Sequence, residues 1–77
     1  MKIQLRDGKV LEAEDVPQFL KQFRAVSFTR KKTLWGFMGE CSRRAANAGY
    51  TLPTTDEDAF FQGLLDMGEI QWAEDVN

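Results

Sequence analysis

Apolar residues recur with two different periods along the chain, and the order of these periods predicts the fold. In the first segment, MKIQL, apolar and polar residues alternate, which is typical of a strand with one buried face. Asp7-Gly8 follows, a dipeptide favoured where both residues of a tight hairpin turn need positive φ. Residues 10–13 can then return as a second strand, and in the predicted register Leu5 lies opposite Val10.

A helix is predicted over residues 16–26. Asp15 is a good N-cap, and Pro17 falls in the first turn, where a missing N–H does no harm. The apolar residues of this segment share one helical face, which is predicted to be buried: Val16, Phe19, Leu20, Phe23 and Val26.

The second predicted helix, within residues 27–50, is the longest element. It follows a connection of about three residues, with Ser27 or Thr29 as N-cap and Gly49 just past its C-terminus. At 100° per residue one narrow stripe of this helix is apolar and is predicted to face the core: Leu34, Phe37, Met38, Cys41, Ala45 and Ala48.

Residues 54–58, TTDED, resemble a capping box and predict the start of a third helix. Its predicted buried set is Phe60, Phe61, Leu64, Leu65 and Met67. Gly68 ends it, and Ile70 and Trp72 alternate with polar residues as a last strand that can join the hairpin. The sequence therefore predicts a small α+β domain spanning residues 1–77, in the order β-β-α-α-α-β, with three helices packed on one face of a three-stranded antiparallel sheet.

Composition narrows the class of protein. The 77 residues are 43% apolar with nine aromatics (six Phe, two Trp and one Tyr), which is typical of a globular chain. The charged N-terminus does not match a signal peptide, and no apolar run is long enough for a bilayer, so we expect a cytoplasmic protein without a membrane partner. Because a core of this size is small, self-association as a homodimer is an alternative that the sequence leaves open.

No residue pattern predicts catalysis, a cofactor or a metal site. The chain has no His, and Cys41 falls in an apolar stripe, where a small buried residue is expected rather than a nucleophile. Three acids, Asp56, Glu57 and Asp58, stand where a helix start favours acids, without the spaced ligands and central Gly of a calcium loop. Catalytic, cofactor-binding and metal-ligating residues are therefore predicted to be none.

The charge is unevenly distributed, although the net charge is only −2. Residues 21–44 hold seven cations against Glu40 alone, whereas residues 45–77 hold seven acids and no cation. This segregation either makes the folded molecule bipolar or is neutralised internally, if the acidic third helix packs onto the basic second one. The sequence leaves both alternatives open.

Three cations, Arg30, Lys31 and Lys32, are predicted in the first turn of the second helix, at the positive end of its dipole. At that position each cation destabilises the helix by a few tenths to about 1 kcal/mol. Folding alone does not favour this placement, so we expect something outside the domain to bind these side chains.

A helical wheel extends this predicted basic surface. Lys32 and Arg43 fall about 20° apart, beside two glycines and with Trp35 at the border. Because each glycine inside a helix costs about 1 kcal/mol, two of them suggest a close approach to this backbone. The approaching group is either a neighbouring helix, with Trp35 as a lid, or a partner anchored by Trp35.

These observations favour a small non-catalytic interaction or regulatory module that presents its basic second helix to a protein partner. The predicted partner-binding residues are Arg30, Lys31, Lys32, Trp35 and Arg43. The alternative is a nucleic-acid-binding protein with a helix-turn-helix-like arrangement of residues 16–48, although a pI near 5.0 opposes it. In length and composition the chain is similar to many short accessory proteins of bacteria and their phages.

Overall fold

A computed structural model of the chain describes residues 1–26 and 33–73. Its elements are β1 (Lys2–Leu5), β2 (Val10–Glu12), α1 (Val16–Val26), α2 (Leu34–Asn47), α3 (Glu57–Asp66) and β3 (Ile70–Trp72). The three strands form one antiparallel sheet in the order β2-β1-β3. The predicted α+β class, the element order and the place of the last strand beside the hairpin are confirmed.

The sheet has one buried and one exposed face. Ile3 and Leu5 of β1 point into the core, and Leu5 pairs with the buried Ile70 of β3. On the other face Gln71 donates from Nε2 to Oε1 of Gln4, 2.8 Å away. The predicted alternation therefore marks the buried face of β1, whereas in β3 Ile70 is buried and Trp72 is 55% exposed.

The hairpin turn differs from the prediction. Leu5 lies opposite Lys9, whose carbonyl accepts from Leu5 N at 2.7 Å, and Val10 lies opposite Gln4. Gly8 has φ of 95°, whereas Asp7 does not have a positive φ. The loop thus has three residues, of which the last is Gly8. The N–H of Gly8 closes a tight turn by donating to the Leu5 carbonyl at 2.9 Å, and Gly8 itself has the left-handed conformation.

This one-residue difference moves Val10 to the other face of the sheet. A register shift of one residue exchanges the two faces of a strand. Val10 therefore lies on the outer face and is 50% exposed, while Leu11, opposite Ile3, packs against the core.

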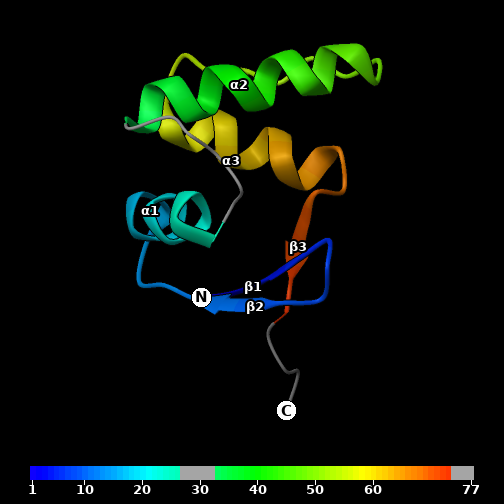
Figure 1. The fold of residues 1–77 in the computed structure, drawn as a ribbon. Coiled ribbons are helices and arrows are strands. Elements are labelled where there is room, and N and C mark those ends of the chain that lie inside the picture. The colour runs from blue at the N-terminus through cyan, green and yellow to red at the C-terminus, as the bar shows by residue number, and fades with distance from the viewer. Residues whose placement is uncertain (27–32, 74–77) are drawn as a thin grey trace.

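All three helices lie on the same side of the sheet, but in two layers (Figure 1). α1 contacts β2 and α3 contacts β3, and these two helices also contact each other. α2 lies on the side of them that is farther from the sheet and contacts α1 (Figure 1). The core fills the space between the layers, and its largest fully buried side chains are Phe19, Phe37, Phe60, Ile3, Leu20, Met38, Leu64 and Ile70.

The N-termini of α1 and α3 are capped by the predicted acids. Asp15 accepts from Gln18 N at 2.9 Å, and Asp56 accepts from Ala59 N at 2.7 Å. Glu57 and Asp58 occupy the first turn of α3, where carboxylates complement the helix dipole.

The predicted start of α2 is wrong. Thr33 is the N-cap, and its Oγ1 accepts from Gly36 N at 3.1 Å. Thr33 directly precedes Leu34, the first residue of the apolar stripe, and this position favours an N-cap. The predicted caps Ser27 and Thr29 lie outside the described residues.

Glycines end α2 and α3 in the same way, as predicted. Gly49 has φ of 88° and Gly68 has φ of 80°. The N–H of the next residue donates to a carbonyl in the last turn, from Tyr50 to Ala45 at 2.9 Å and from Glu69 to Leu64 at 3.0 Å. These are Schellman turns, which satisfy carbonyls that the helix end leaves unpaired.

Candidate functional site

Two of the five predicted partner-binding residues can be placed. Trp35 and Arg43 are both exposed on α2, and Trp35 is 55% exposed. They are eight residues apart, about 12 Å along the helix axis, so the fold does not bring them into contact. Arg30, Lys31 and Lys32 lie outside the described residues.

The helical wheel that joined Lys32 to Arg43 assumed that both residues belong to one helix. α2 begins at Leu34 and its first turn contains no Lys or Arg, while Lys32 lies outside the described residues. What remains is a surface that we call the outer surface of α2, defined by Trp35, Gly39 and Arg43, which lie one turn apart.

The outer surface of α2 is open. A Cβ atom added at Gly39 would have no neighbour within 4 Å, so no other helix packs against this glycine. Within the described parts of the chain, Trp35 stacks on no other ring and Arg43 forms no ion pair. At Gly39, therefore, no neighbouring helix fills the gap that the sequence left open.

The acids of α3 do not neutralise the described cations of α2. Arg44 pairs within α2 with Glu40 at 4.0 Å, and Arg6 of the hairpin loop pairs with Glu69 at 3.0 Å. In residues 1–26 and 33–73 no ion pair joins α2 to α3. In both pairs the arginine is exposed and the glutamate is partly exposed, and surface pairs of this kind contribute about 0–1 kcal/mol.

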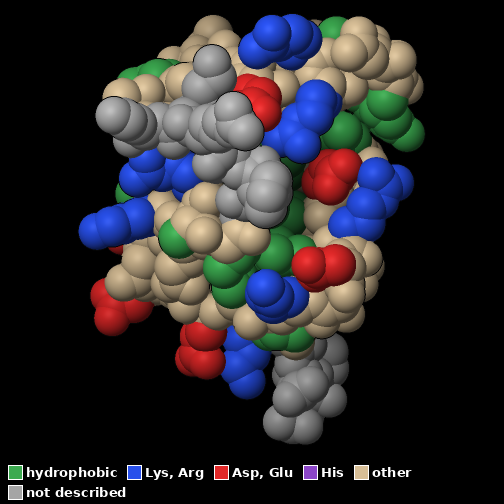
Figure 2. Space-filling model, viewed as in Figure 1, with side chains coloured by type: hydrophobic (Ala, Val, Ile, Leu, Met, Phe, Trp, Pro, Cys, Tyr) green, Lys and Arg blue, Asp and Glu red, His purple; other side chains and the backbone are tan. Residues whose placement is uncertain are grey.

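A second feature, which the sequence did not predict, is a cleft of about 630 Å³. Apolar side chains line most of it, and Figure 2 shows apolar side chains in a hollow of this face, with acidic and basic side chains beside it. The cleft lies between the hairpin loop, the end of α1, the second half of α2 and the end of α3. The residues lining it are Leu5, Arg6, Asp7, Phe23, Val26, Phe37, Cys41, Arg44, Ala45, Ala48, Tyr50, Leu52, Leu64, Met67 and Glu69.

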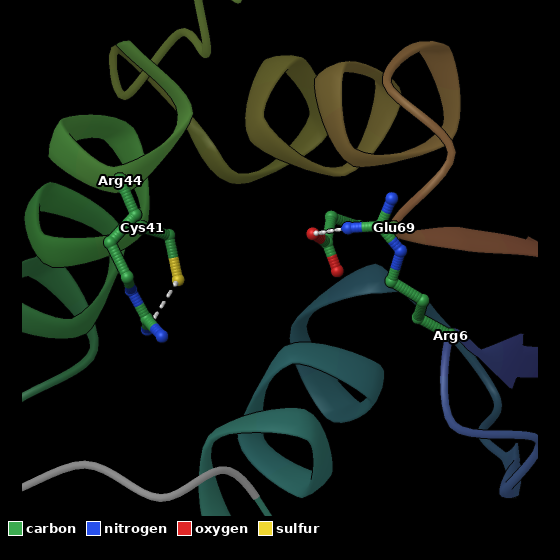
Figure 3. A network of polar contacts seen from close by, with 4 residues as sticks. All are labelled: Arg6, Cys41, Arg44 and Glu69. Atoms are coloured by element: carbon green, nitrogen blue, oxygen red, sulfur yellow. Dashed lines mark hydrogen bonds and ion pairs between the residues drawn. The ribbon is translucent and has the colours of Figure 1, made fainter. Parts of the chain in front are cut away.

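Polar groups face each other across this cleft (Figure 3). On the α2 side, Nη2 of Arg44 is 3.9 Å from Sγ of Cys41, and on the opposite side lies the pair between Arg6 and Glu69. Asp7, in the hairpin loop, accepts from Lys9 N at 2.9 Å. The cleft thus has apolar walls with charged groups on two sides.

The Cys41 thiol is half-buried in this cleft. Burial raises the pKa of Cys41, and the nearby Arg44 opposes this rise only in part. A thiol with a raised pKa stays protonated near neutral pH and is a poor nucleophile. Cys41 therefore has the environment of a structural residue.

Neither a metal-binding cluster nor a membrane-spanning helix is present among the described residues. Within the described ranges, no three His, Cys, Asp or Glu side chains lie close enough together to hold a metal ion. In the same ranges no helix combines the length and apolarity that crossing a bilayer requires.

The sequence missed the cleft because its lining comes from segments that are far apart in the chain. Val26 and Ala48, at the ends of two predicted apolar stripes, were expected in the core. Both are exposed, Val26 by 42%, and line the cleft instead. The sequence showed only that each of these residues stands at the C-terminal end of its apolar stripe.

Comparison of the chain with protein-family models, curated proteins and solved structures found no match. Function is therefore argued from the geometry of the outer surface of α2 and of the cleft.

Proposed function

We propose that the protein is a non-catalytic interaction module that binds a protein partner through the outer surface of α2. The observation that carries this proposal is the 55% exposure of Trp35, on a helix that also supplies the fully buried Phe37, on its opposite side, and Met38. Tryptophan and arginine are the residues most enriched among the side chains that dominate protein–protein binding energy.

The open glycine supports the same surface. Gly39 lies one turn from Trp35 and one turn from Arg43, and none of the described residues packs against it. A glycine in a helix lets another backbone approach closely, at a cost in helix stability of about 1 kcal/mol. A partner that packs over Gly39 can therefore bury Trp35 on one side and contact Arg43 on the other.

The nucleic-acid alternative has lost part of its support. It depended on a tight turn between two helices and on cations in the first turn of the second. Residues 27–32, with the predicted turn and the three cations, lie outside the described residues, and the first turn of α2 contains no Lys or Arg. Nucleic-acid binding is retained as an outcome of the test.

The test combines affinity capture with measured affinities. Immobilised protein captures partners from a lysate of the source cells, mass spectrometry identifies them, and calorimetry measures the Kd of each purified partner. We expect Trp35→Ala to weaken binding by about 2 kcal/mol, roughly 30-fold, and Arg43→Gln to weaken it less.

Trp72→Ala is the matched control. Trp72 is also 55% exposed, but it lies at the sheet edge, away from α2. Partner binding that survives Trp35→Ala, or that both tryptophan variants weaken equally, contradicts the proposal. Retardation of duplex or single-stranded nucleic acid that falls steeply from about 50 to 200 mM salt, and that needs Arg30, Lys31 and Lys32, supports the alternative.

A further inference from the structure

The cleft has the size and the lining of a small-molecule site, independently of the outer surface of α2. Sites for small ligands have volumes of about 300–1,000 Å³, with mostly apolar walls and a few polar groups that orient the ligand. The cleft, at about 630 Å³, falls within this range. Phe23, Cys41 and Met67 are only partly buried in it, so apolar surface is available to a ligand.

The four charged side chains that line the cleft differ in how fully they are paired. Arg6 and Glu69 hold each other at 3.0 Å, and Asp7 accepts from Lys9 N. Arg44 has weaker partners: a thiol sulfur at 3.9 Å and the Glu40 carboxylate at 4.0 Å, the latter beyond hydrogen-bond distance. Arg44 is thus the more weakly paired of the two arginines that line the cleft.

The guanidinium of Arg44 favours a ligand that carries an anionic group. It is planar, always charged and has five donors in a geometry that matches a carboxylate with two parallel hydrogen bonds. A cationic headgroup would instead be repelled by Arg44, and Glu69, one of the two acids that line the cleft, already pairs with Arg6.

We propose that the cleft binds a small apolar molecule that ends in a carboxylate, with the acid group on Arg44 and the apolar part against Phe23 and Met67. An alkyl chain of about eight carbons is a suitable probe, since the volume and the apolar walls favour a flexible hydrocarbon. The ligand class is therefore a free medium-chain aliphatic acid.

The experiment is a titration of ¹⁵N-labelled protein with sodium octanoate, followed by amide chemical shifts, with 1-octanol as the uncharged control. We expect saturable shifts at Phe23, Cys41 and Met67, and at least about tenfold weaker binding of octanol, because it cannot make the charge-assisted bonds. Equal affinity for octanol, or no saturable change at the cleft, overturns the proposal.

Arg44→Gln and Arg43→Gln form a matched pair, since each removes one exposed cation from the same turn of α2. Only Arg44 lines the cleft. We expect Arg44→Gln to weaken octanoate binding about tenfold and Arg43→Gln to leave it within about twofold. Equal effects of the two variants overturn the assignment of the carboxylate to Arg44.

Trp35→Ala separates this proposal from the protein-binding one. Trp35 does not line the cleft, so octanoate affinity should be unchanged in this variant. A loss of octanoate binding in Trp35→Ala, or shifts centred on Trp35 and Arg43, places the ligand on the outer surface of α2 and contradicts the cleft site.

Discussion

The two sides of α2 differ in almost every physical respect, although their residues alternate along one short segment. On the outer surface Trp35, Gly39 and Arg43 face open space. On the inner side Phe37 is fully buried and Arg44 lines the cleft. Because successive residues of a helix point 100° apart, the neighbours Arg43 and Arg44 lie on different surfaces. A basic stretch of sequence therefore does not define one basic surface.

The largest test of this difference compares two aromatic residues on α2. Phe37 packs edge-on against Phe23 and Phe60, at centroid distances of 5.5 and 6.5 Å. We expect Phe37→Ala to lower the free energy of unfolding by about 3–5 kcal/mol, whereas Trp35→Ala should change it by about 0.5 kcal/mol. Urea denaturation followed by circular dichroism measures both.

Phe37→Leu is the second variant if Phe37→Ala does not fold. It keeps an apolar side chain and should lose about 1–2 kcal/mol. Equal losses for the Phe37 and Trp35 variants would remove the distinction between the two sides of α2.

Alanine substitution at two helical glycines should change the stability of the protein in opposite directions. A Cβ atom at Gly63 of α3 would lie 2.5 Å from Leu52 Cδ1 and 3.0 Å from Pro53 Cδ, whereas one at Gly39 would meet nothing within 4 Å. We expect Gly63→Ala to destabilise the protein by about 1–3 kcal/mol through overpacking. Gly39→Ala should stabilise it by about 0.5–1 kcal/mol through helix propensity.

Thermal and urea unfolding of both glycine variants measure this. Loss of stability in Gly39→Ala would show that another group already packs against the outer surface of α2. A stabilised Gly39→Ala protein that binds its partner less well would strengthen the proposed function, because the added methyl group then obstructs only the partner.

Thr33 is the N-cap of α2 and so determines where the helix begins. Its hydroxyl accepts from Gly36 N, so Thr33→Ala should lower the free energy of unfolding by about 1 kcal/mol. Thr33→Ser retains the hydroxyl and is the control, with an expected change of a few tenths of a kcal/mol. A Thr33→Ala protein as stable as the original would contradict the observed start of α2.

The smallest expected effect concerns Cys41 on the cleft side. Because burial raises its pKa, the rate of alkylation by iodoacetamide should reach half its maximum at a higher pH than for an unstructured cysteine. Arg44→Gln should raise this midpoint further, since Arg44 lowers the pKa of Cys41, and Arg43→Gln should not.

The raised pKa of Cys41 also makes the stability of the protein depend on pH. A thiol whose folded pKa is raised keeps its full contribution below the pKa of the unfolded thiol, and loses it as the pH rises towards the folded value. Unfolding free energies measured across this alkaline range should therefore fall less in Cys41→Ala than in the original protein. An identical pH dependence in the two proteins would contradict the burial of this thiol.

Much of the fold could be predicted because the relevant signals are local. The caps Asp15 and Asp56 and the terminal glycines Gly49 and Gly68 act within one helical turn of their own positions. The hairpin register was not predictable from Asp7-Gly8, since a two-residue turn and a three-residue loop with one left-handed glycine both suit this dipeptide. The start of α2 was misplaced for a similar reason, because three hydroxyl residues, Ser27, Thr29 and Thr33, precede it.

The sequence by itself determined the kinds of element, their order and the buried faces of β1 and of the helices, because hydrophobic period and capping chemistry depend only on near neighbours. Only the tertiary structure decided that Val26 and Ala48 line a cleft and that Arg44 faces it while Arg43 does not. The reason is physical: a cleft forms where segments far apart in the chain fail to fill the space between them. That depends on how whole helices pack, which no short stretch of sequence encodes.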